Sequence, residues 1–324
     1  MRSVATLAAL LIATTLHADR IFVTNERGGT IAVIDSKTDR VIGNVAAPTR
    51  PRGIVVSPDR KRLYVAVSHF RDKPSRTRDE VLALDAATLK VVQRYAAGTD
   101  PEGVAVTPDG ARFVVSNEDA GTASMVETRS GRTIAALVVG TEPEGVAASG
   151  DGRTVYVTGE TSNTISVIDV ARAKVTAVIL VETRPRGIVF TRDSKRAYVT
   201  CEIAGAINVI DGKTNRVTRK IALGKADRPV GLVLSPDEKR LYVATGRGNC
   251  VAVIDTATAR MIKTIPVGNR PWGIALTHDG KKLYVANGLS NDVTVIDVAT
   301  SRAIATIPKV GDGPWGVTVL RTED

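Results

Sequence analysis

Charged and aromatic residues recur directly before and after the proline of one repeated tripeptide, Pro-x-Gly. These are the residues of the sequence whose types could do chemistry. The tripeptide begins at Pro51, Pro101, Pro143, Pro185, Pro229, Pro271 and Pro314. The middle residues are Arg52, Glu102, Glu144, Arg186, Val230, Trp272 and Trp315, and the residues before the prolines are Arg50, Asp100, Glu142, Arg184, Arg228, Arg270 and Gly313. Carboxylates serve as general bases or ligands of hard cations, and guanidinium groups beside indole rings suit a planar anion.

The charges of these tripeptides are segregated along the chain. The second and third copies are acidic, and the same repeats add Glu118, Asp119 and Glu160. The other copies bring the arginines and both tryptophans of the chain. If the copies meet in space, we expect one acidic sector beside one basic, aromatic sector.

Two interpretations of the basic sector remain open. In the first, Trp272, Trp315 and the arginines bind a planar anionic ligand, such as the tricarboxylate pyrroloquinoline quinone (PQQ). In the second, the tryptophans form a plug, and the arginines pair with Glu26, Glu202 or the acidic sector. The acidic sector is likewise open to two interpretations, Ca²⁺ binding and structural ion pairing, because no spacing in it is diagnostic of a metal site.

Other motifs narrow the chemistry. The three histidines, His17, His69 and His278, form no zinc or copper motif, and the sequence has no Cys-x-x-Cys-His haem motif or Gly-x-Ser-x-Gly nucleophile turn. Cys201 and Cys250 come from adjacent repeats, and two inert thiols are favoured over a disulfide. We find no nucleic-acid-binding motif.

The elements that must position these residues follow from the spacing of the tripeptides, which lie 42 to 50 residues apart. Each repeat holds four short runs rich in β-branched residues, for example GIALT, KLYVAN, DVTVID and AIATIP. Four strands in about 42 residues is the blade of a β-propeller. The sequence therefore predicts an all-β, seven-bladed propeller with four-stranded antiparallel blades, whose channel mouth is lined by the residues beside each proline.

The two ends of the chain predict how the ring closes. The chain opens with three strand-like runs, IFVTN, IAVID and RVIGNV, and ends with a single run, PWGVTVL. We expect the C-terminal strand to join the N-terminal blade, because this pairing removes an exposed sheet edge. The domain assignment is a propeller over residues 19–324, preceded by a secretory signal peptide over residues 1–18. This signal predicts a periplasmic or secreted protein, and no other segment is long enough to span a membrane.

The net charge of +10 is concentrated in two classes of turn, those between first and second strands and those between third and fourth strands. Both classes emerge on the face opposite the mouth, so that face is expected to be basic. It could dock an acidic partner or anionic lipid, although solubility alone also accounts for it. An insertion over residues 68–80 lengthens one hairpin at the mouth, and its role is left open between function and disordered elaboration.

The sequence also resembles a known family. The segments YVTG (156–159), YVTC (198–201) and YVAN (284–287) are similar to YVTN-family propeller repeats. The segments GETSNTISVID (159–169), CEIAGAINVID (201–211) and NGLSNDVTVIDVAT (287–300) resemble the subgroup associated with PQQ-dependent catabolism. This resemblance implies an exported protein associated with periplasmic alcohol oxidation. We predict a monomeric, non-enzymatic scaffold that binds a partner protein or an anionic small molecule at the channel mouth. The alternative is a Ca²⁺-dependent, lactonase-like hydrolase that uses the acidic sector.

The candidate binding residues at the mouth come from every part of the predicted ring. They are Arg50, Arg52, Glu102, Glu144, Glu160, Arg184, Arg186, Glu202, Arg228, Arg270, Trp272 and Trp315.

Overall fold

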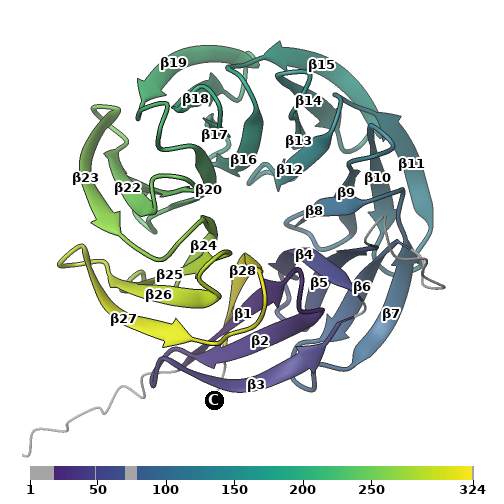
Figure 1. Cartoon of the computed structure of the whole chain (residues 1–324). Helices are drawn as coiled ribbons and strands as arrows, with labels where there is room; N and C mark the ends of the chain where they lie inside the picture. Colours follow the sequence, from purple (N-terminus) through teal and green to yellow (C-terminus); the bar gives the residue numbers. More distant parts are fainter. Residues whose placement is uncertain (1–17, 48, 70–78, 323–324) are drawn as a thin grey trace, which may run out of the picture.

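Seven four-stranded antiparallel sheets surround one central axis in the computed structural model of the protein (Figure 1). The structure describes residues 18–47, 49–69 and 79–322. Most of the predicted signal peptide and residues 70–78 of the insertion therefore lie outside the described residues. The prediction of a seven-bladed propeller is confirmed. Among the described residues, no helix is long and apolar enough to cross a membrane.

Each blade uses four consecutive strands, except that the last strand of the chain belongs to the first blade. The strands of the first three blades are β28 (Pro314–Arg321), β1 (Asp19–Asn25), β2 (Thr30–Asp35), β3 (Arg40–Ala46); β4 (Arg50–Val56), β5 (Arg62–Ser68), β6 (Glu80–Asp85), β7 (Val91–Ala96); and β8 (Pro101–Val106), β9 (Arg112–Asn117), β10 (Thr122–Glu127), β11 (Thr133–Val138).

The other four blades are built in the same way. Their strands are β12 (Pro143–Ala148), β13 (Thr154–Gly159), β14 (Thr164–Asp169), β15 (Lys174–Leu180); β16 (Pro185–Phe190), β17 (Arg196–Cys201), β18 (Ala206–Asp211), β19 (Arg216–Ala222); β20 (Pro229–Leu234), β21 (Arg240–Thr245), β22 (Cys250–Asp255), β23 (Arg260–Pro266); and β24 (Pro271–Leu276), β25 (Lys282–Asn287), β26 (Asp292–Asp297), β27 (Arg302–Pro308).

The ring is closed by β28, which pairs antiparallel with β1, as Figure 1 shows. In this register Phe22 lies opposite Thr318 and Val23 opposite Val317. The Asn25 side-chain amide also donates a 3.0 Å hydrogen bond to the Val310 carbonyl. The predicted closure is confirmed, and the edge of the N-terminal blade is paired.

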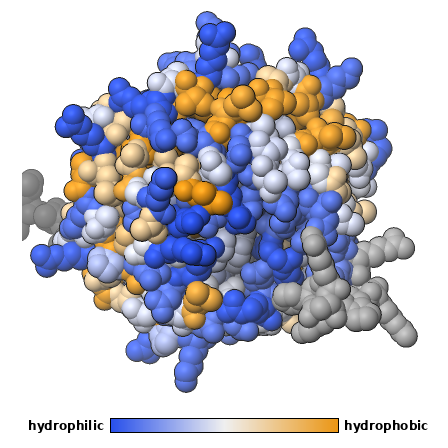
Figure 2. Space-filling model, turned by 45° about the horizontal axis from the view of Figure 1, so that its top comes forward, coloured by the Kyte–Doolittle hydropathy of each residue, from blue (hydrophilic) through white to orange (hydrophobic). Residues whose placement is uncertain are grey.

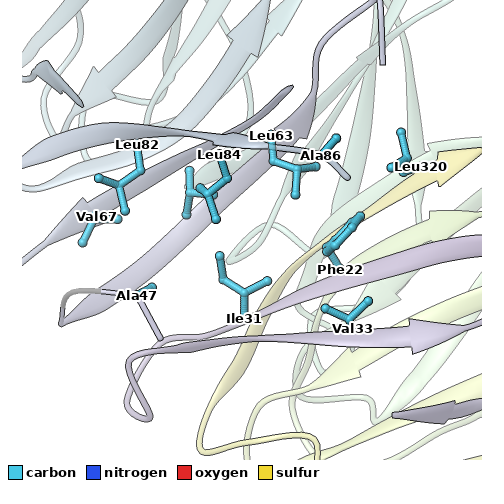
Figure 3. Packing of buried hydrophobic residues seen from close by; sticks show 11 residues of the cluster. Phe22, Ile31, Val33, Ala47, Leu63, Val67, Leu82, Leu84, Ala86 and Leu320 are labelled. Atoms are coloured by element: carbon cyan, nitrogen blue, oxygen red, sulfur yellow. The ribbon is translucent and has the colours of Figure 1, made fainter. Parts of the chain in front are cut away.

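Hydrophobic side chains fill the spaces between neighbouring blades. In Figure 3, Phe22, Ile31 and Val33 of one blade face Leu63 and Leu84 of the next, and all are buried. The exposed large hydrophobic side chains lie mostly on the outer, fourth strands, among them Val138 and Leu180. Figure 2 shows hydrophobic residues gathered near the rim and hydrophilic residues over most of the remaining surface in view. Cys201 and Cys250 are free thiols.

The glycine of each Pro-x-Gly tripeptide lets the inner strands approach one another around the channel. A Cβ atom added at any of the seven glycines would lie closer than 3.0 Å to the carbonyl oxygen of the middle residue in the next blade. The series ends with Gly316, which meets Arg52 O and so closes the circle. The glycines are therefore required by packing around the axis.

Adding a methyl group to this ring is expected to destabilise the protein. A Cβ at Gly187 would lie 2.6 Å from Val230 O and 2.7 Å from Leu232 Cδ2. We expect Gly187→Ala to reduce the free energy of unfolding by about 1–3 kcal/mol, the usual cost of overpacking. Gly43→Ala is the matched control, because nothing lies within 4 Å of a Cβ at Gly43. Urea denaturation of both variants measures the difference, and equal stability would contradict the packing role.

Candidate active site at the channel mouth

Two repeated positions direct side chains into the channel mouth. The first is the Pro-x-Gly tripeptide, where every inner strand carries an irregularity of register: Pro101 pairs with Asn117, but Val104 pairs with Val115. The extra residue forms a β-bulge, and bulges re-aim side chains. The second position is the first residue after each second strand, which is Glu26, His69, Glu118, Glu160, Glu202, Gly246 and Gly288 in chain order.

One group of contacts joins the first three blades. Arg50 and Arg52 both bind Glu26 Oε1 through Nε, at 2.8 and 3.0 Å. Arg50 Nη1 also contacts both carboxylate oxygens of Asp100 at 2.9 Å. Arg52 Nη1 contacts Glu102 and lies 3.4 Å from Glu118 Oε2. Four carboxylates thus share two guanidinium groups, and we call these six residues the acid-rich cluster.

A second group of contacts, centred on Arg186, joins the fourth and fifth blades. Arg186 Nη1 contacts Glu144 and lies 2.5 Å from Glu160 Oε2, while its Nε donates to Glu202 at 2.8 Å. Arg184 contacts Glu160 and lies 3.3 Å from Glu202. The arginines thus pair with Glu26, Glu202 and residues of the acidic sector, as the second interpretation of the basic sector predicted.

The two tryptophans link these groups around the remainder of the mouth. Their rings stack with centroids 6.2 Å apart and an interplanar angle of 25°. Arg52 lies over Trp315 at 5.9 Å, and Arg270 lies over Trp272 at 4.5 Å. Both indoles are only half-buried, so they remain partly accessible.

Two hollows open at the mouth. A cavity of about 120 Å³ is lined by Glu144, Arg186, Val230, both tryptophans and five of the ring glycines. A wider hollow of about 590 Å³ is lined by Gly246, Arg247, Asn249, Asn269, Arg270 and Leu289, and its Arg270 lies over the Trp272 ring. The mouth therefore has space beside an aromatic surface, as sites for small polar molecules do.

The crowding of carboxylates changes their protonation. Burial raises the pKa of Glu118 to about 7, and the nearby charges of Asp100 and Glu144 act in the same direction. Burial, together with the neighbouring Glu144, also raises the pKa of Glu160. Burial opposes the charge of Arg186, but Glu144, Glu160 and Glu202 outweigh it and raise its pKa. The mouth thus holds a carboxyl group that changes charge near neutral pH.

The structure brings together eleven of the twelve residues predicted for the mouth. The exception is Arg228, which is half-buried at the rim and forms no ion pair with the described carboxylates. Glu26 and Glu118 were not among the twelve, although both contact Arg52. The sequence nevertheless pointed to both, to Glu118 as part of the acidic sector and to Glu26 as a partner of the arginines, and they occupy the same position in the repeat as Glu160 and Glu202.

The acid-rich cluster does not suit a calcium ion as it stands. Ligand atoms of Asp100, Glu102 and Glu118 lie within 4.8 Å of one another, which would allow a shared cation. However, Arg50 and Arg52 already contact all three carboxylates, and Ca²⁺ requires six to eight oxygen ligands. We therefore derive no chemical step through a metal ion at this place.

Comparison with protein families gives one match. Residues 180–320 are similar to the family model described as "Lactonase, 7-bladed beta-propeller". Among curated proteins, none is significantly similar to this chain.

Solved structures with the same fold are numerous, and three are informative. A chain of the hydrazine synthase of Kuenenia stuttgartiensis is 25% identical, with a TM-score of 0.73 over 84% of this chain and 95% of that one. The periplasmic gluconolactonase of Pseudomonas aeruginosa is 19% identical, with a TM-score of 0.80 over 94% and 100%. A putative 6-phosphogluconolactonase of Bacteroides fragilis is 19% identical, with a TM-score of 0.76 over 95% and 99%. At 19% identity, the two lactonases show a shared fold.

These findings correct the prediction of a scaffold for PQQ-dependent alcohol oxidation. The family match is to lactonases, which favours the alternative of a lactonase-like hydrolase. The contacts agree, because Arg52 and Arg186, which were expected to receive a planar tricarboxylate, are ion-paired with glutamates. The prediction of a scaffold for PQQ-dependent alcohol oxidation is therefore wrong.

Proposed function

We propose that the channel mouth hydrolyses the lactone of a small polyhydroxy acid. The observation that carries the proposal is Glu118, whose carboxyl group has a pKa of about 7 and lies beside the guanidinium of Arg52. A general base works best when its pKa lies near the working pH. The match of residues 180–320 to a lactonase family supports this reaction class.

The chemistry needs only groups that the mouth contains. Ionised Glu118 takes a proton from a water molecule whose oxygen attacks the acyl carbon of the lactone. Arg52, with Nη1 3.4 Å from Glu118, stabilises the negative charge that develops on the carbonyl oxygen. The bond between the acyl carbon and the ring oxygen then breaks, and the ring oxygen receives the proton that Glu118 took from water, which gives the open hydroxy acid and restores the ionised carboxylate.

The aromatic pair explains how such a substrate is held. A lactone ring is uncharged, so it can lie against Trp315 without displacing an ion pair. The wider hollow offers amide and guanidinium groups of Asn249, Asn269 and Arg247 for hydroxyl groups. Arg270, whose pKa is lowered by burial and by the nearby charges of Arg186 and Arg247, lies between the hollow and the indole.

The test is the hydrolysis of glucono-δ-lactone by the purified protein, followed by titration of the acid released above the spontaneous rate. We expect turnover that is unchanged by EDTA and by added Ca²⁺, because arginines already engage the acid-rich cluster. Turnover lost with EDTA and restored by Ca²⁺ would instead support the calcium-dependent form of the prediction. Absence of turnover across a panel of five- and six-membered aldonolactones would reject the proposal.

The pH dependence of turnover follows from Glu118. Its pKa in the folded protein is about 7, so the ionised form needed to accept a proton disappears below that pH. We expect kcat/KM, after subtraction of the buffer-catalysed rate, to fall about tenfold per pH unit below pH 7 and to level off above it. A profile that is flat between pH 5 and 8 would exclude Glu118 as the base.

We also propose that the protein is exported. The N-terminal segment has the pattern of a secretory signal, and the gluconolactonase of Pseudomonas aeruginosa that shares this fold is periplasmic. The membership of these repeats in the YVTN family stays a prediction. N-terminal sequencing of protein recovered from a periplasmic extract tests the cleavage expected after Ala18.

A further inference from the structure

The protein is electrically polar along the propeller axis. The face opposite the mouth consists of turns between first and second strands and turns between third and fourth strands. The two classes lie side by side: Ala86 N donates to Lys61 O, and Val298 N donates to Lys281 O. Thirteen of these turns are formed by uninterrupted chain. Counted from the last residue of one strand to the first residue of the next, they hold 23 basic and 15 acidic residues. Counted in the same way, the described loops of the mouth face hold 8 basic and 13 acidic residues.

The acids and bases of the far face differ in how they are presented. The aspartates fold back onto the backbone, as Asp193 does by accepting from Lys195 N at 3.0 Å and Asp237 from Lys239 N at 3.1 Å. Lys195 Nζ lies 3.3 Å from Asp193 Oδ2 and Lys239 Nζ lies 4.0 Å from Asp237 Oδ2, but these lysine side chains are 81% and 78% exposed, against 52% and 58% for the aspartates. In these two turns the basic group is therefore more exposed than the acid beside it.

We propose that the far face docks onto an anionic phospholipid surface and leaves the channel mouth directed toward solvent. Protein interfaces rely on a buried aromatic or arginine anchor in a fitted pocket. Among the described residues, the large hydrophobic side chains that are exposed include no aromatic ring and lie on the outer strands and mouth hairpins, so this face has no exposed aromatic anchor. Evenly distributed point charges suit mobile lipid headgroups, which rearrange beneath them.

The dipolar arrangement also sets the orientation. The acidic mouth face is repelled by the same lipids, so attraction and repulsion act together to turn the mouth away from the bilayer. A substrate released or delivered at the surface would then reach an open site. Binding of this kind requires no insertion, and it weakens with salt because the charges are exposed.

The experiment is cosedimentation of the full mature chain with vesicles, without substrate, so its result is independent of the proposed hydrolysis. We expect binding to phosphatidylcholine vesicles containing 30% phosphatidylglycerol at 20 mM salt, and none to pure phosphatidylcholine or at 500 mM salt. Each surface lysine contributes about fivefold to such binding, so Lys195→Gln/Lys239→Gln should weaken it about 30-fold. The matched control, Lys225→Gln/Lys309→Gln, removes two exposed charges from the mouth face and should not weaken binding.

Three results would overturn the inference: no binding to the anionic vesicles, equal loss in both double variants, or binding that persists at 500 mM salt. A fourth arm uses soluble polyglutamate as competitor. If polyglutamate binds tightly while the vesicles do not, the face recognises an acidic polypeptide instead. Circular dichroism of each variant confirms that the fold is retained.

Discussion

Glu118→Gln is expected to reduce kcat for lactone hydrolysis by 10²- to 10⁴-fold, because the amide cannot accept the proton of the attacking water. The change is nearly isosteric, and the protonated form of Glu118 is already populated near its pKa of about 7. The contact with Arg52 is long, at 3.4 Å, so its loss disturbs the cluster little. The effect should appear in kcat with KM nearly unchanged. Stopped assays with glucono-δ-lactone at pH 8 measure it.

Asp119→Asn is the matched control, since it removes a carboxylate from the exposed neighbouring position of the same hairpin. We expect this variant to retain turnover within twofold.

The stability of Glu118→Gln gives a second measurement. Because the folded-state pKa of Glu118 is raised, its favourable contribution is present at low pH and is lost as the pH rises through about 7. Gln does not titrate, so Glu118→Gln should melt at a higher temperature than the wild type at pH 8.5. A variant with full activity would reject Glu118 as the base.

The fold could be predicted from the sequence because each of its signals is local and repeated seven times. The Pro-x-Gly spacing sets the blade length, and the unmatched run at each end predicts the pairing of β28 with β1. The ring packing explains why the tripeptide recurs, since a Cβ at Gly103 or Gly231 would collide with the next blade. The same steric requirement applies in every blade, so the same tripeptide occurs in every repeat.

The sequence left the pairing at the mouth open between ion pairs and a basic sector that binds an anion. Sequence order places Glu102 and Glu144 in acidic repeats and Arg52 and Arg186 in basic ones. In the ring these repeats adjoin, so Arg52 meets Glu102 and Arg186 meets Glu144. Spacing alone does not show which side chains meet, because the contact depends on how far each side chain extends toward the neighbouring blade. The raised pKa of Glu118 has the same origin, because it depends on burial and on acids from other blades.

Arg186→Met is expected to reduce the free energy of unfolding by about 3–5 kcal/mol at pH 8, the usual result of removing one partner from a buried ion-pair network. The Arg186 side chain is 12% exposed and contacts Glu144, Glu160 and Glu202, whose side chains are 8%, 4% and 6% exposed. Methionine matches the length of the side chain and keeps contact with Trp272, so packing is largely retained. What remains is three buried carboxylates without their central cation. Chemical denaturation with urea measures the loss.

Arg184→Met provides the control, because Arg184 contacts the same Glu160 and Glu202 but is 39% exposed. Solvent screens such a pair, and we expect a loss of unfolding free energy below about 1 kcal/mol.

The loss of unfolding free energy in Arg186→Met should also depend on pH. Without the guanidinium, three buried carboxylates lie close together with no cation between them, so they oppose folding when ionised but not when protonated. The loss should therefore be smallest near pH 5 and grow as the pH rises toward 8. Equal losses for the two arginine variants, or a deficit for Arg186→Met that shrinks toward pH 8, would show that the network does not hold the mouth together by charge.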